Sequence, residues 1–278
     1  LFAIILLPLH EKCKGFFITK KEGESMIKIS IDDGHGVETP GKRTPQFADG
    51  SIMKENEFNK IVAGYLEFAL KRCGFAVVQT APENDDVPLS VRAKRANQAN
   101  SDLHISIHAN AYGNSWNSAN GIETFVYNLR DTCSTGAAKA IQNEIIKATG
   151  LHDRGVKENS NLYILNSTKM PAVLVECGFM TNRKEAALLR SDSYRRTIAE
   201  AICKGVCSYF GQAYKQPNNP QKEVYKVEQS KIIVDGKTYD INRILHEGNN
   251  WLKIREIAEL LGYTVSYQGS IAVLTKKK

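Results

Sequence analysis

The sequence predicts an α/β domain with a largely parallel sheet flanked by helices, followed by a small α+β domain. Between residues 26 and 211, short runs rich in Val, Ile, Phe and Tyr alternate with stretches of helical periodicity. This alternation is typical of strand–helix–strand units. The runs that predict strands are IKISID (27–32), FAVVQT (75–80), LHISIH (103–108), IETFVY (122–127), LYIL (162–165) and AVLVE (172–176).

Apolar residues spaced three and four apart predict three helices. One covers 56–72 and is stopped by Gly74, and the others lie around 137–146 and 194–209. Each has a single apolar face, as a helix packed on a sheet requires. In such sheets, functional groups gather just beyond the carboxyl ends of the strands.

Composition excludes several classes of protein. The 278 residues are 42% hydrophobic and 24% charged, which is typical of a globular chain. No apolar run reaches the ~20 residues of a membrane span, and six cysteines are too few for a disulfide scaffold. The net charge of +7 includes no basic stripe interleaved with aromatics. We therefore expect no nucleic-acid partner, and an anionic surface suits the charge better.

The first 25 residues are predicted to be a doubtful leader or upstream translation. LFAIILLPL (1–9) is apolar, but no basic region precedes it and no small-residue cleavage site follows it. Residues 20–25 read like the in-frame translation of a purine-rich ribosome-binding site, and Met26 stands directly before the first predicted strand. The hypothesis is that the native product starts at Met26.

A polar segment with two prolines, 212–224, is predicted to link the domain 26–211 to a small domain, 225–278. The small domain contains a hairpin signal at 235–236, a helix closed by Gly262 and a second hairpin at 268–269.

Ionisable side chains stand at the ends of three predicted strands. His35 follows the first strand, His108 ends the third and Glu176 ends the last, while Glu55 begins the first helix. Two imidazoles and a carboxylate are a usual catalytic zinc set. A lone strand-end histidine is more often a satisfied polar group, and Glu55 could simply favour the helix dipole. Glu176 is harder to dismiss, because an unpaired carboxylate in an apolar strand is costly.

Six motifs follow in order: IDDGHG (31–36), KENEFN (54–59), ANQANSDLHISIHAN (96–110), GIETFVY (121–127), RGVKENSNLYIL (154–165) and PAVLVECGFMTN (171–182). Together they resemble the zinc-dependent N-acetylmuramoyl-L-alanine amidases over residues 26–210. These enzymes cut peptidoglycan between the sugar and the stem peptide. The resemblance implies a mixed sheet flanked by helices and one Zn²⁺ held by His35, Glu55 and His108. It also implies that Glu176 is the catalytic glutamate, acting as general base on zinc-activated water.

The sequence departs from the family at two positions. Asp33 stands where proline is common before Gly-His, and it adds an acidic group near His35. His104 replaces an apolar residue and shares a strand face with His108, so it is an alternative ligand that the family pattern disfavours.

Four polar residues are candidate substrate contacts. Asn110 and Asn182 follow the strand ends at His108 and Glu176 and could bond the stem peptide, while Arg154 and Lys157 could meet its carboxylates.

Cysteines are predicted to be structural. Cys203 and Cys207 share a helix face, but two sulfurs are insufficient for a structural zinc site. Cys177 is predicted to point away from Glu176 into the core.

The small domain resembles the copper-amine-oxidase N-terminal-like (stalk) domains of bacterial surface proteins. Its single histidine, His246, implies no copper site. A core of about 55 residues is marginal, so we expect wall targeting, interaction with the enzyme or self-association.

The predicted function is a peptidoglycan amidase of endolysin or autolysin type acting at the bacterial cell wall. It would be cytosolic until lysis if Met26 is the start, and otherwise exported. Peptidoglycan is the expected partner, with anionic wall polymers as further candidates. The alternatives are a non-catalytic wall-binding protein on an amidase fold, and a zinc peptidase of the stem peptide.

Overall fold

A computed structural model describes residues 26–83, 85–217, 227–234, 237–246, 249–252, 254–268 and 271–276. The chain divides into two compact units, Leu1–Pro217 and Asn218–Lys278. The predicted leader 1–25 and the second half of the predicted linker lie outside the described residues. The domain boundaries given above therefore stay predictions.

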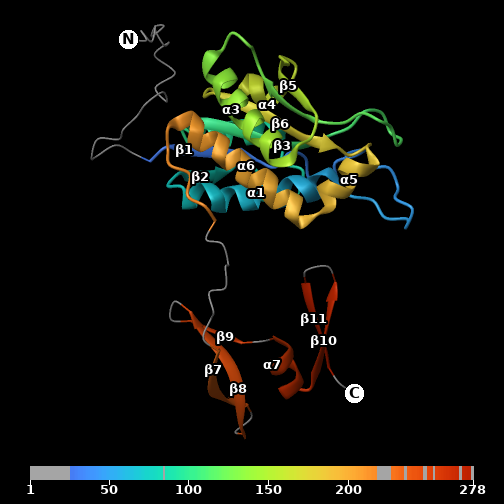
Figure 1. Ribbon diagram of the computed structural model, residues 1–278, viewed down its shortest axis with the longest axis vertical. Coiled ribbons are helices and arrows are strands. Elements are labelled where there is room, and N and C mark those ends of the chain that lie inside the picture. The colour runs from blue at the N-terminus through green and yellow to red at the C-terminus, as the bar shows by residue number, and fades with distance from the viewer. Residues whose placement is uncertain are drawn as a thin grey trace. The chain divides into compact units, whose positions relative to one another are not determined.

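Six strands of the first unit form one sheet in the order β2-β1-β3-β6-β4-β5 (Figure 1). Neighbours are parallel except β4 and β6, which are antiparallel. The sheet is thus mixed and mostly parallel, which confirms the predicted fold class. The strands are β1 (Lys28–Asp32), β2 (Ala76–Gln79), β3 (Leu103–Asn110), β4 (Ile122–Val126), β5 (Asp153–Glu158) and β6 (Ala172–Phe179).

Helices cover both faces of this sheet. Figure 1 shows α1, α3 and α6 on one face, with α6 between the other two. Helices α2 and α4 supply the apolar contacts of the opposite face. The helices are α1 (Glu55–Arg72), α2 (Leu89–Gln98), α3 (Thr132–Thr149), α4 (Tyr163–Ser167), α5 (Arg183–Arg190) and α6 (Asp192–Phe210).

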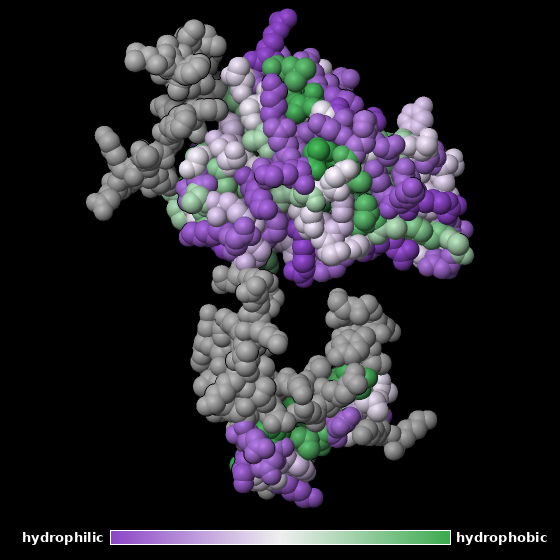
Figure 2. Space-filling model, in the orientation of Figure 1, coloured by the Kyte–Doolittle hydropathy of each residue, from purple (hydrophilic) through white to green (hydrophobic). Residues whose placement is uncertain are grey.

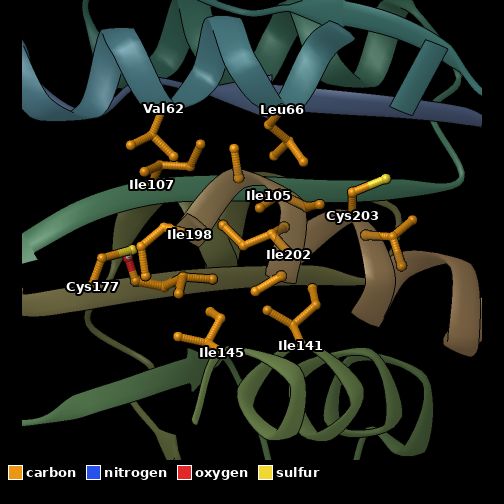
Figure 3. Close-up of a cluster of buried hydrophobic side chains, with 14 of the residues drawn as sticks. Val62, Leu66, Ile105, Ile107, Ile141, Ile145, Cys177, Ile198, Ile202 and Cys203 are labelled. Atoms are coloured by element: carbon orange, nitrogen blue, oxygen red, sulfur yellow. Dashed lines mark hydrogen bonds between the residues drawn. The ribbon is translucent and has the colours of Figure 1, made fainter. Parts of the chain in front are cut away.

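The main core lies between the sheet and the three helices of the first face. Ile105 and Ile107 of β3 meet Val62 of α1 and Ile202 of α6 (Figure 3), and all four are fully buried. Burial of each such side chain contributes about 1.5–3 kcal/mol. The core therefore fixes β3 firmly, and with it the strand end that carries His108.

Four elements differ from the sequence prediction. LYIL is not a strand but the start of α4, because its Ile164 and Leu165 pack together with Leu174 of β6; a four-residue apolar run does not distinguish the two structures. Strand β5 was missed because it is a charged edge strand. Helices α2 and α5 were missed because each buries only three residues.

The second unit contains short antiparallel sheets and one helix, so it is a small α+β unit. Its elements are β7 (Val227–Val234), β8 (Lys237–His246), β9 (Asn249–Leu252), α7 (Ile254–Leu260), β10 (Tyr263–Gln268) and β11 (Ile271–Lys276). The strands that flank the two predicted hairpins pair as expected, although residues 235–236 and 269–270 lie outside the described residues. Gly262 ends α7 with a φ of 76°, as predicted.

Within the described part of the chain, no helix combines the length and apolar character needed to cross a bilayer. Hydrophilic side chains cover most of the visible face of the first unit (Figure 2).

Candidate active site

The four predicted site residues come from three neighbouring strands and the start of α1. Strand β3 lies between β1 and β6, with Asp32 opposite Ser106 and His108 opposite Glu176. Because parallel strands present their carboxyl ends at one edge, His35, His108 and Glu176 meet at the same edge of the sheet.

His35 is held in an uncommon backbone conformation. Its φ is 65°, in the left-handed region that few non-glycine residues adopt. Its carbonyl accepts hydrogen bonds from Asn56 Nδ2 and Arg92 Nη2, both at 2.9 Å. At Gly34, a Cβ would come within 2.2 Å of the His108 ring. Side chains of α1 and α2, together with this glycine, therefore fix the turn that presents His35.

Arg92 organises a buried polar layer beneath that turn. Its side chain is 1% exposed, and it donates from Nη1 to Asp32 Oδ1 and from Nε to the Val87 carbonyl, both at 2.7 Å. Asp32 also accepts a hydrogen bond from Ser106 Oγ at 2.7 Å. Burial raises the pKa of Asp32, but the charge of Arg92 outweighs this and holds it below its usual value. The layer is an ion pair that anchors the loop.

Glu55 lies between the two imidazoles. Its Oε1 is 2.9 Å from His108 Nδ1, and its Oε2 is 3.3 Å from His35 Nε2. Burial raises the pKa of Glu55, but the hydrogen bond and charge of His108 and then the charge of His35 outweigh it. Burial lowers the pKa of His35 to about 4. Burial also acts to lower the pKa of His108, but the bond and charge of Glu55 raise it overall.

These three residues could hold a metal ion. Their ligand atoms all lie within 4.8 Å of one another. Two imidazoles and one carboxylate match a catalytic zinc set, which leaves a coordination position open. The alternative ligand, His104, lies further back on β3, where its Nδ1 is 2.9 Å from Ser30 Oγ. The donor set therefore fits a divalent cation, and His104 is outside it.

Glu176 stands beside this group with an unsatisfied oxygen. Its Oε2 is buried and has no hydrogen-bond partner among the described residues. Burial raises the pKa of Glu176 to about 7, although His108 opposes the shift. Glu176 lines a cavity of about 570 Å³ together with Glu55, His108 and Lys42. A carboxyl with a free oxygen at a cavity can accept a proton from a bound water or substrate.

Three of the four predicted substrate contacts converge on one carboxylate, Glu123, which is opposite Glu176 in the β4–β6 pair. Asn110 Nδ2 donates to its Oε1 at 2.6 Å, while Arg154 Nε and Lys157 Nζ donate to its Oε2 at 2.8 and 2.5 Å. The sequence prediction omitted Glu123. It interrupts an apolar strand just as Glu176 does, so the same signal could have found it.

The fourth, Asn182, caps α5. Its Oδ1 accepts from the backbone N–H groups of Lys184 and Glu185, and its Nδ2 donates to the Ala119 carbonyl at 3.0 Å. The side chain is thus occupied by its own chain, and a contact with substrate stays a prediction.

Asp33 is buried behind His35 rather than among the metal-capable groups. Its carboxyl oxygens have no hydrogen-bond partner among the described residues, and Oδ1 is 3.7 Å from Arg92 Nη1. Burial, followed by the charge of Asp32, raises the pKa of Asp33 to about 7.

An α/β sheet whose edge carries two imidazoles, a carboxylate and an unbonded carboxyl beside a cavity has the parts of a metal-dependent hydrolase. Residues 29–208 match the family model of N-acetylmuramoyl-L-alanine amidases. The chain belongs to this family, which confirms the predicted family and enzyme class.

Individual relatives and structures agree. The chain is 35% identical over 183 residues to the N-acetylmuramoyl-L-alanine amidase LytC of Bacillus subtilis, covering 66% of this chain and 35% of LytC. It is 32% identical over 227 residues to the endolysin of Bacillus phage SPP1, covering 77% and 80%. The crystal structure of an N-acetylmuramoyl-L-alanine amidase from Clostridium difficile 630 matches with a TM-score of 0.62 and 33% identity, covering 68% of this chain and 98% of that one.

Proposed function

We propose that the chain hydrolyses the amide bond between N-acetylmuramic acid and the L-alanine of the stem peptide, with Zn²⁺ held by His35, Glu55 and His108 and with Glu176 as general base. The observation that carries this proposal is the unbonded, buried Oε2 of Glu176 beside three converging donors. An unsatisfied buried carboxyl costs free energy, so its position is explained best by chemistry.

The donors suit one zinc ion per catalytic domain. With its pKa at about 4, His35 is neutral near pH 7 and offers a lone pair. Glu55 supplies one negative charge from a side chain that is 3% exposed. When bound, Zn²⁺ supplies Lewis-acid chemistry, because it polarises a carbonyl oxygen and makes water more acidic.

Glu176 would accept the proton of the attacking water and pass it to the departing amine of L-alanine. Its register position opposite His108 places it next to the donor group, and its pKa of about 7 lies near a working pH. The products are a glycan strand with a free lactyl carboxylate and a peptide with a free L-alanine amine.

The cluster around Glu123 would recognise carboxylates of the stem peptide. Two cations, Arg154 and Lys157, share one carboxylate, so the cluster keeps a net positive charge. Their side chains are 30% and 40% exposed and remain open to a ligand. Asn110 would add a polar contact beside the cavity that it lines.

We place the action at the bacterial cell wall, as a hydrolase of endolysin or autolysin type that binds peptidoglycan. The phage SPP1 endolysin among the relatives supports the first, and a sporulation-specific amidase of Bacillus subtilis, 29% identical over 205 residues, supports a cellular role. The start at Met26, binding of anionic wall polymers and self-association through 225–278 stay predictions.

The test incubates the purified full chain with peptidoglycan, with and without a chelator, and identifies the new chemical ends. New amino-terminal L-alanine that disappears with chelator and returns with Zn²⁺ supports the amidase. Other new amino groups indicate a stem-peptide peptidase, and no product indicates a wall-binding protein.

Glu176→Gln is expected to retain zinc but lose turnover, because the amide cannot accept the proton. Glu144→Gln on α3 is the matched control and should keep full activity. Full activity in Glu176→Gln would defeat the assignment of the base.

A further inference from the structure

Three cysteine side chains meet at the opposite end of α1 from the active site. Cys73 caps the carboxyl end of α1, while Cys203 and Cys207 lie one turn apart on α6. All three are buried, with exposures of 0%, 0% and 2%. Among the described residues, only this group and the active-site group bring three metal-capable side chains so close together.

The spacing of the sulfurs suits a shared cation. All three Sγ atoms lie within 4.8 Å of one another, and the Sγ atoms of Cys73 and Cys203 are 3.6 Å apart. Zinc–sulfur bonds of ~2.3 Å place the sulfurs of a tetrahedral site ~3.8 Å apart. The side chains therefore need little movement to bind one ion.

The surroundings favour thiolate ligands. The backbone N–H of Lys215 donates to Cys73 Sγ at 3.4 Å, and the Lys215 carbonyl oxygen is 3.8 Å from the same sulfur. Arg72 and Lys204 lie close by, with Arg72 Cζ 5.9 Å and Lys204 Nζ 5.1 Å from the centroid of the Tyr214 ring. Hydrogen bonds and nearby cations both stabilise negative sulfur.

Two ordinary explanations account for less. Buried cysteines can act as small apolar residues, but packing alone does not require three sulfurs to converge from two helices. A disulfide would use two of the sulfurs and leave the third beside it. A soft cation uses all three.

We propose that Cys73, Cys203 and Cys207 form a second metal site for a thiophilic cation, Zn²⁺ or Cu⁺, separate from the active site. Soft thiolates select these ions. Each thiol that binds gives its proton to solvent. The bound ion ties the end of α1 to α6 and holds the chain at Lys215 against the core.

Because the sulfurs are covered, the cation has to be present as the chain folds. The full chain is made by cell-free synthesis under reducing conditions with Zn²⁺, Cu⁺ or Cd²⁺. Native mass spectrometry counts bound ions, and ultraviolet absorption detects thiolate-to-metal charge transfer. The matched control is Cys177→Ala, because Cys177 is also a buried thiol but lies at the far side of the core from Cys203 (Figure 3).

We expect Cys203→Ala/Cys207→Ala to bind one cation fewer than the wild type and to lose the charge-transfer band, while Cys177→Ala keeps both. The difference of one ion does not depend on whether the His35 site is filled. Gain of the extra ion with Zn²⁺ or only with Cu⁺ decides between the two ions.

Three results would overturn the proposal. They are equal ion counts in the wild type and the double variant, Cd²⁺ binding by the wild type without a charge-transfer band, and a Cys73–Cys203 disulfide in unreduced protein. If the double variant fails to fold, as judged by circular dichroism, the wild-type band and the variant Cys207→Ser decide.

Discussion

Replacing Arg92 with methionine tests whether the buried ion pair holds the His35 turn in place. The change removes the cation and keeps most of the side-chain volume. Asp32 loses its partner at 2.7 Å, and the carbonyls of Val87 and His35 each lose a donor. Breaking a buried ion pair from one side costs about 3–5 kcal/mol. We expect the free energy of unfolding at pH 7 to fall by that amount.

The loss should depend on pH. In the wild type, Arg92 depresses the pKa of Asp32, so the pair's contribution is present above the unfolded value of 3.8 and is lost as pH falls through the folded value. In Arg92→Met, burial alone raises that pKa, and protonation then relieves the buried charge. The deficit of the variant therefore narrows from pH 7 toward acid. Arg92→Met/Asp32→Asn should recover at least about 1 kcal/mol, because neither charge remains.

The assay is urea unfolding followed by circular dichroism at both ends of this pH range. Lys94→Met, at an exposed position of the same helix, is the control and should be nearly neutral. The reasoning is refuted by a loss at pH 7 below about 1 kcal/mol or by a loss that does not change with pH.

Three further predictions follow from single contacts. Gly34→Ala should reduce both bound zinc and activity, because the new Cβ displaces the His108 ring; normal zinc content with full activity contradicts this. Arg154→Ala should raise KM for peptidoglycan by about tenfold with little change in kcat, the worth of one charge-assisted hydrogen bond, whereas Arg130→Ala should not; an unchanged KM removes Arg154 from substrate recognition. Asn182→Ala should lower the free energy of unfolding by about 1 kcal/mol through loss of the α5 cap, and an unchanged urea midpoint would exclude that role.

The parts of the fold that the sequence predicted correctly are those with strong local signals. Strands β1, β3 and β6 are apolar runs that end in ionisable residues, so His35, His108 and Glu176 could be placed at one edge before their geometry was known. Their meeting in space rests on the strand order, which local sequence does not contain. The roles of these residues as ligands and base stay proposals.

Where prediction failed, tertiary packing decided the outcome. The run at 162–165 became helix α4 because its apolar residues fill a groove beside Leu174. Glu123 was overlooked because its partners, Arg154 and Lys157, come from a charged edge strand that was itself missed. The cysteine cluster required Cys73, which is 130 residues from Cys203 in sequence.

The reversed direction of β4 has a consequence for how this enzyme can be altered. Because β4 runs against β6 and β5 runs with β4, the amino ends of both strands, at Glu123 and Arg154, lie at the edge where β3 and β6 end. The metal-capable donors and the substrate-recognition cluster therefore enter the site from opposite chain directions and from different loops. Loop 111–121 could be exchanged between relatives to change which stem peptides are accepted, while the segments that carry His35, Glu55 and His108 are left untouched.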